Sequence, residues 1–151
     1  MRPLALLVPF FLVVAAPLMH PVTVLTLQDG HAERIVHLRE GSEYTYSYVN
    51  SIYLAPVVER HRVVDGRLII QDVRSTDIRA VEYFRWDGEI RAVGDGFEQT
   101  APSWSTPHLA IRISPAYRQR IEGIETVDLA EVFGDGVVDV APRQFPWLLS
   151  R

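Results

Sequence analysis

The chain of 151 residues contains no cysteine. This excludes disulfides, zinc sites built on thiolates, thiol nucleophiles and lipid anchors attached to cysteine. Lysine is also absent, so arginine supplies all 15 basic residues against 19 acidic ones, and the net charge is −4. A chain with this balance has no basic field that could hold a nucleic-acid backbone, so we expect no nucleic-acid partner.

Recognisable catalytic and ligand-binding motifs are missing as well. No two of the five histidines have a spacing that puts both on one face of one element, as a zinc site requires. The sequence has neither a Gly-x-Ser-x-Gly elbow nor a glycine-rich phosphate loop. Its Asp-Gly pairs are too sparse for a calcium loop. We therefore expect no catalytic residue, no metal and no cofactor, and a protein that is not an enzyme.

The N-terminus is hydrophobic and has one leading positive charge. Arg2 precedes 13 apolar residues at 4–16, and the next charged residue is Asp29. This is the layout of a secretory signal. Because the cation lies in front of the apolar stretch, the N-terminus is expected to stay in the cytoplasm while the following chain is exported. We expect the folded part on the extracytoplasmic side of the cell membrane, either anchored there or secreted.

The sequence leaves open whether this leader is removed. Val14 and Ala16 suit the positions before a cleavage site, whereas Pro17 would hinder cleavage. An uncleaved apolar run continues through Thr23 and is long enough to cross a bilayer. We assign residues 1–25 to a signal peptide or membrane anchor, expected as a hydrophobic helix.

After the leader, the sequence is typical of strands joined by tight turns. Asp-Gly accepts the positive φ angles of hairpin turns and is a strong hairpin signal between strand-like runs. Three hairpins are expected around such pairs, with strands at 22–27 and 34–38, at 57–64 and 67–73, and at 81–86 and 89–93. The chain has five Asp-Gly pairs in all, and the first three lie in these hairpins: Asp29-Gly30, Asp65-Gly66, Asp87-Gly88, Asp95-Gly96 and Asp135-Gly136.

Other segments complete an all-β pattern. Residues 43–48 alternate tyrosines with small or charged side chains, which predicts a strand with one aromatic face. A short helix is expected only at 128–134, which has Asp128 for its N-cap and Gly134 at its end. The region 94–107 is the least regular. We expect residues 26–145 to form an antiparallel β-sandwich or flattened barrel of about nine strands with at most one short helix.

Charged and aromatic residues allow more than one interpretation. Acids next to arginines on predicted strands, such as Glu59 with Arg60 and Glu82 with Arg85, indicate solvated ion pairs more than acid–base pairs. The aromatic side chains either fill the core, as they most often do, or form an interaction surface. The aromatic residues in question are Tyr44, Tyr46, Tyr48, Tyr53 and Trp104.

Residues 46–63 resemble the signature segment of the domain-of-unknown-function family 1850. In that family, a hydrophobic N-terminus precedes a strand ending in His-Ser and then a Pro-Val-x-Glu strand. The chain matches at Ser47, Pro56, Val57 and Glu59, whereas Tyr46 stands where many members have histidine. The similarity covers roughly residues 20–142. It marks Tyr46, Ser47, Pro56 and Glu59 as positions of functional weight.

The resemblance implies an association rather than an activity. The family has no established activity, and its genes often lie beside those of tripartite (TRAP) transporters with a TAXI-type solute receptor. The implied partner is the transporter's membrane subunit or its solute receptor. Our leading hypothesis is therefore an exported, membrane-tethered accessory or binding module.

Two alternatives stay open. One is an extracytoplasmic hydrolase that uses Ser47 or Ser51 with Glu59 and His61, which would require these side chains to converge. The other is a β-sandwich that binds a carboxylate ligand through arginines such as Arg60 and Arg62.

Overall fold

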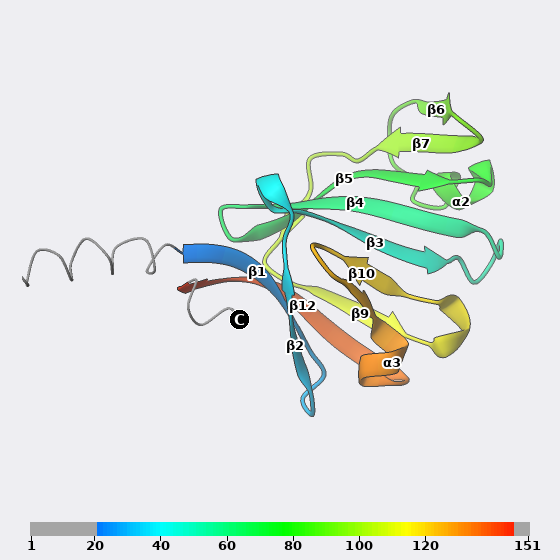
Figure 1. Cartoon of the computed structure of the whole chain (residues 1–151). Coiled ribbons are helices and arrows are strands. Elements are labelled where there is room, and N and C mark those ends of the chain that lie inside the picture. Colours follow the sequence, from blue (N-terminus) through cyan, green and yellow to red (C-terminus); the bar gives the residue numbers. More distant parts are fainter. Residues whose placement is uncertain (1–20, 147–151) are drawn as a thin grey trace, which may run out of the picture.

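A computed structural model describes residues 21–146 of the chain, which form two antiparallel sheets packed face to face (Figure 1). The all-β antiparallel fold class is thereby confirmed. The described residues contain twelve strands, compared with about nine expected, and two short α-helices where at most one was expected. The predicted N-terminal helix lies largely outside the described residues. Within 21–146, no helix is long and apolar enough to span a membrane.

The smaller sheet has four strands and the larger one eight. The small sheet has the order β2-β1-β12-β9, and the large sheet the order β11-β10-β3-β4-β5-β7-β6 with β8 also paired to β5. The small-sheet strands are β1 (Pro21–Gln28), β2 (Glu33–His37), β9 (Leu109–Ile113) and β12 (Gly136–Pro146). The large-sheet strands are β3 (Glu43–Val49), β4 (Pro56–Val64), β5 (Arg67–Ser75), β6 (Ile90–Val93), β7 (Gly96–Thr100), β8 (Ser105–Thr106), β10 (Arg120–Glu122) and β11 (Thr126–Asp128). The helices are α2 (Ile78–Glu82) and α3 (Leu129–Phe133), with single 3-10 turns at Glu40–Ser42 and Pro115–Tyr117.

Several local predictions are confirmed. The hairpins around residues 29–30 and 65–66 form, as β1 with β2 and β4 with β5. Asp65 and Gly66 have φ angles of 50° and 69°, the positive pair that a two-residue turn between twisted strands requires. The helix α3 also forms, because the Asp128 side chain accepts hydrogen bonds from the backbone N–H groups of Ala130 at 3.1 Å and Glu131 at 3.3 Å.

The hairpin expected around residues 87–88 is wrong. Residues 78–82 form α2 instead, with Asp77 as the N-cap and Val81 fully buried on the helix. The strand β6 pairs with β7, which lies in the region expected to be irregular. Gly96 allows this arrangement, since a Cβ there would lie 2.6 Å from the Ser75 carbonyl oxygen on β5. Tertiary packing has therefore overridden the local turn signal.

The inner face of the large sheet is covered in two parts, by the small sheet and by α2. One cluster joins Leu68 and Ile121 to β1 of the small sheet, and the second joins Val73 of β5 to α2. Tyr48 packs against both clusters. The boundary expected between residues 25 and 26 falls within β1, where Val24, Leu25 and Leu27 are fully buried.

Candidate functional site

The four positions marked by the family resemblance do not converge. Tyr46 and Glu59 are direct register partners on β3 and β4 and both are buried. Ser47 pairs with Val58 instead. Because side chains alternate across a strand, Ser47 lies on the opposite face of the sheet from Glu59. Pro56 lies at the exposed start of β4.

A buried polar group occupies the inner face of the large sheet; we call Tyr44, Tyr48, Glu59 and His61 the inner polar row. The Tyr48 hydroxyl donates to Glu59 Oε1 at 3.0 Å, and His61 Nε2 lies 3.0 Å from Glu59 Oε2. The Tyr44 ring stacks on the His61 ring, with centroids 4.8 Å apart. Glu59 is only 7% exposed and His61 is 0% exposed, so the expectation that Glu59 belongs to a solvated ion pair is wrong.

Burial keeps the tyrosines of this region neutral. It raises the pKa of Tyr46 to about 12; the hydrogen bond that Gln119 donates at 2.8 Å opposes this rise, and the charge of Glu59 adds to it. Burial together with Glu59 also raises the pKa of Tyr44 and Tyr48. A neutral Tyr48 can donate to Glu59. Among the described residues, the Tyr44 hydroxyl and His61 Nδ1 have no hydrogen-bond partner.

The inner polar row lacks the nucleophile that the hydrolase alternative requires. Ser47 is on the other face of the sheet, and Ser51 is exposed in the β3–β4 turn. No hydrogen bond joins either serine side chain to His61 in the described part of the chain. The geometry therefore favours a structural role for Glu59 and His61. Their contacts with Tyr48 and Tyr44 hold β4 in register with β3 on the face that packs against the small sheet.

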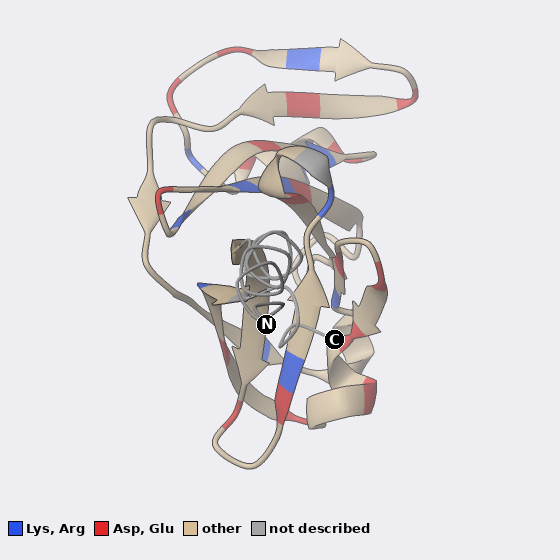
Figure 2. Cartoon of the chain, turned by 60° about the vertical axis from the view of Figure 1, so that its left-hand side comes forward, with Lys and Arg blue, Asp and Glu red and all other residues tan. Residues whose placement is uncertain are grey.

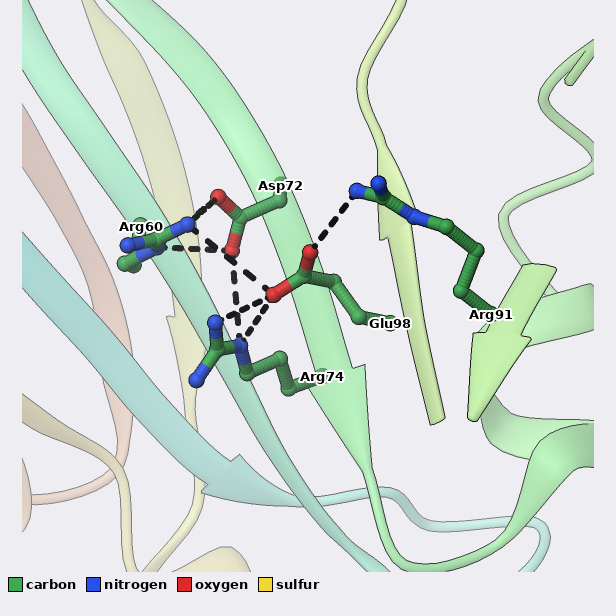
Figure 3. Close-up of polar contacts among 5 residues, drawn as sticks. All are labelled: Arg60, Asp72, Arg74, Arg91 and Glu98. Carbon is green, nitrogen blue, oxygen red and sulfur yellow. Dashed lines mark hydrogen bonds and ion pairs between the residues drawn. The ribbon is translucent and has the colours of Figure 1, made fainter. Parts of the chain in front are cut away.

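The outer face of the large sheet has a second polar group, the outer ion network of Arg60, Asp72, Arg74, Arg91 and Glu98 (Figure 3). Arg60 Nε donates to Asp72 Oδ1 at 2.8 Å, and this hydrogen bond is the main cause that raises the pKa of Arg60. Arg74 Nε and Arg91 Nη2 donate to Glu98 at 2.5 and 3.1 Å. Asp72 and Glu98 are only 4% and 7% exposed, because the arginines cover them.

These contacts weaken the carboxylate-ligand alternative. Arg60 donates to Asp72, and Arg62 Nε donates to the Gly41 carbonyl at 3.0 Å. An incoming carboxylate would also meet the charges of Asp72 and Glu98 beside Arg60. On the side of the molecule that Figure 2 presents, acidic and basic positions are interspersed among uncharged ones, as the interleaved charges predicted.

The predicted core role of the aromatic residues is confirmed for two of them, since Tyr44 is 2% and Tyr46 8% exposed. A different set of apolar side chains is exposed where β3 turns into β4 and where α2 lies. Figure 1 shows this end of the large sheet far from the start of β1. We call it the apolar end; its members are Ile52 (58% exposed), Leu54 (75%), Ile78 (37%) and Tyr83 (53%).

Local hydrogen bonds hold the β3–β4 turn in one shape. Asn50 Oδ1 accepts from the backbone N–H groups of Ile52 at 2.9 Å and Tyr53 at 3.0 Å, and the Asn50 carbonyl accepts from Leu54 N at 2.8 Å. The Tyr53 ring turns inward, 6.4 Å from the ring of Tyr83 in an edge-to-face arrangement. Leu54 is left with a φ of +53° and a projecting side chain.

Sequence reasoning missed the apolar end. The available signal was a run of four apolar residues, 52–55, between an asparagine and a proline that favour a turn. Within the described part of the chain, no three His, Asp or Glu side chains are grouped so that they could hold a metal ion. Comparisons of the chain with protein-family models, curated proteins and solved structures find no match. The similarity to family 1850 stays a prediction that rests on the residues quoted above.

Proposed function

We propose that this chain is an exported binding module, tethered to the membrane by its N-terminal segment, that contacts a partner protein through the apolar end. The observation that carries the proposal is the exposure of Leu54 at 75% in a left-handed backbone conformation. Bulky side chains rarely adopt this conformation, and such strain concentrates at functional positions. Exposed apolar side chains grouped on one surface are typical of an interface.

The surroundings of Leu54 suit binding. The hydrogen bonds of Asn50 and the packing of Tyr53 against Tyr83 fix the turn before any partner arrives, so little conformational entropy is lost on contact. Arg79 is paired with Asp77 and lies over the Tyr53 ring, 5.2 Å from its centroid. The border of the apolar end is thus polar but internally neutralised, as at the rim of a protein interface.

The position of the apolar end is also consistent with a tethered module. The start of β1, which follows the N-terminal segment, lies at the opposite end of the domain from the β3–β4 turn (Figure 1). A domain held to a membrane through that segment would present the apolar end away from its attachment point. The resemblance to family 1850 suggests the membrane subunit or the solute receptor of a TAXI-type tripartite transporter as the partner. A surface that points away from the membrane suits the solute receptor better.

The proposal can be tested by co-purification in mild detergent from membranes that contain the full chain and the transporter. Leu54→Asn removes the apolar side chain, and asparagine tolerates the left-handed conformation, so the fold is expected to persist. Val64→Asn is the matched control, because Val64 is 37% exposed at the other end of β4. We expect Leu54→Asn to abolish recovery of the transporter subunit and Val64→Asn to leave it unchanged.

Two outcomes would contradict the proposal. If neither transporter subunit co-purifies with the unmodified chain, the transporter is not the partner. If the Leu54→Asn and Val64→Asn variants recover equal amounts of transporter subunit, the apolar end is not the contact surface. A thermal melt of both variants shows whether any loss of recovery arises from unfolding.

A further inference from the structure

A second apolar feature lies apart from the apolar end. A cavity of about 200 Å³ opens between β5, the segment that follows α2 and the loop between β7 and β8. It shares no residue with the apolar end. Its lining consists of Ile70, Phe84, Trp86, Ala101, Pro102 and Trp104.

The cavity lies beside an irregularity in the large sheet. The register between β4 and β5 shifts between Arg60 and His61, so that Arg60 faces Asp72 whereas His61 faces Ile70. Gln71 is the extra residue, and Ile70 joins the inner face together with His61. Ala101 N donates to the Gln71 carbonyl at 2.9 Å, which anchors the start of the loop at the bulge.

Hydrogen bonds and side-chain packing together hold the opposite wall. Gln99 Nε2 donates to the backbone carbonyls of Trp86 at 3.0 Å and Gly88 at 3.2 Å. The rings of Phe84 and Trp86 contact each other with centroids 4.8 Å apart. Trp104, 42% exposed on the β7–β8 loop, forms the solvent side. The walls of the cavity are therefore fixed.

We propose that this cavity binds one uncharged, ring-sized apolar molecule. Among residues 21–146, no charged side chain lines the cavity, so a charged ligand would lose its hydration without gaining a partner. A dry apolar cavity of about 150 Å³ in another protein accommodates benzene, so the space available here is enough for one aromatic ring. Phe84, Trp86 and Trp104 supply the edges and faces that an aromatic ring prefers to contact.

The proposal is tested by titrating the purified full chain with toluene, and with benzoate as the charged molecule of similar size. Indole N–H signals in ¹H–¹⁵N NMR spectra report the occupancy of the cavity, and Trp104→Phe identifies the Trp104 signal. We expect saturable shifts with toluene and none with benzoate. Ala101→Met fills the cavity and is expected to weaken toluene binding by about tenfold or more, since the ring loses its apolar contacts. Ala92→Met, at an exposed position of β6, is the matched control and should bind as the unmodified chain does.

Trp104→Ala provides a second variant, since Trp104 is partly exposed and its loss should spare the fold. It is expected to weaken toluene binding as well. Three outcomes would each overturn the proposal. These are shifts that do not saturate, equal toluene binding by the Ala101→Met and Ala92→Met variants, and benzoate binding as strong as toluene binding. Transporter recovery is measured separately, so failure here is distinguishable from failure of the proposed function.

Discussion

The inner polar row and the outer ion network share β4, whose successive residues belong to one group or the other. Glu59 and His61 of β4 face the core, and Arg60 between them faces outward. Each group contains a carboxylate that is less than a tenth exposed, Glu59 inside and Asp72 outside. The two carboxylates differ in what surrounds them. Glu59 contacts a tyrosine hydroxyl and an imidazole, whereas Asp72 contacts guanidinium groups that are themselves half-exposed.

This difference in surroundings predicts how much stability is lost when one side chain of each group is removed. Loss of one member of the inner polar row leaves a buried polar atom with no replacement partner, because water has little access. Loss of one member of the outer ion network exposes its neighbours to water, which replaces part of the interaction. Similar carboxylate burial therefore predicts unequal energetic consequences.

The largest effect should appear on raising the pH, because several buried tyrosines respond together. With no lysine or cysteine in the chain, tyrosine is the main side chain that titrates between about pH 9 and 12. The folded state raises the pKa of Tyr44, Tyr46 and Tyr48, so it keeps protons that the unfolded chain releases. This stabilisation is fully present below about pH 10 and is lost as the pH rises through the folded-state value of about 12 for Tyr46.

The measurement is urea unfolding at a series of alkaline pH values. Each tyrosine should lower the free energy of unfolding by about 1.4 kcal/mol per pH unit within this window. Tyr46→Phe should reduce the slope by one tyrosine's share between pH 10 and the folded-state pKa of about 12. A slope identical to that of the unmodified chain would show that Tyr46 does not contribute to the inner face as described.

The next effect is that of removing His61. His61→Ala takes away the ring stacked on Tyr44, leaves a space in the core and leaves Glu59 with Tyr48 alone. We expect a loss of about 3 kcal/mol in the free energy of unfolding, measured with urea at pH 7. His37→Ala is the control, because the His37 side chain is 36% exposed and 3.8 Å from Glu125, and it should cost less than about 1 kcal/mol. Similar losses for both variants would mean that the inner polar row adds nothing beyond an ordinary surface contact.

The fold could be predicted from the sequence where the signal is local. The hairpin at Asp65-Gly66 needs only two residues with positive φ, and α3 needs only its cap at Asp128. The pairing of β6 with β7 depends instead on Gly96 fitting against Ser75, twenty-one positions earlier in the chain. A contact at this separation leaves no pattern in a short stretch of sequence. The prediction for residues 81–86 therefore followed the local turn signal and gave a strand.

The candidate sites could be predicted only in part. The sequence marked Glu59 as a candidate but did not predict that its side chain is buried on the inner face of the sheet. An acid beside an arginine resembles a solvated ion pair. Along β5, alternation fails at Gln71, so that Ile70 faces inward as Leu68 does whereas Asp72, two positions later, faces outward. The exposure of Leu54 depends on Tyr53 turning toward Tyr83, a contact between two separate elements. Each of these outcomes depends on the tertiary structure and not on residue type.

The smallest effect should separate the outer ion network from an ordinary surface ion pair. Asp72→Asn keeps the shape of the side chain and removes the charge that Arg60 contacts, and we expect a loss of about 1–2 kcal/mol at low salt. Asp135→Asn is the matched change in the pair with Arg112, whose side chains are 77% and 62% exposed and lie 3.5 Å apart, and it should cost less than about 0.5 kcal/mol.

Urea unfolding in low salt and in about 1 M salt completes the test, because salt screens exposed pairs more than covered ones. Salt should remove the effect of Asp135→Asn and leave most of the effect of Asp72→Asn. If both effects vanish together, the arginines that cover Asp72 do not keep water and ions away from it. The contrast between the two faces would then be one between core and open surface, and the near-complete burial of Asp72 would have no energetic consequence.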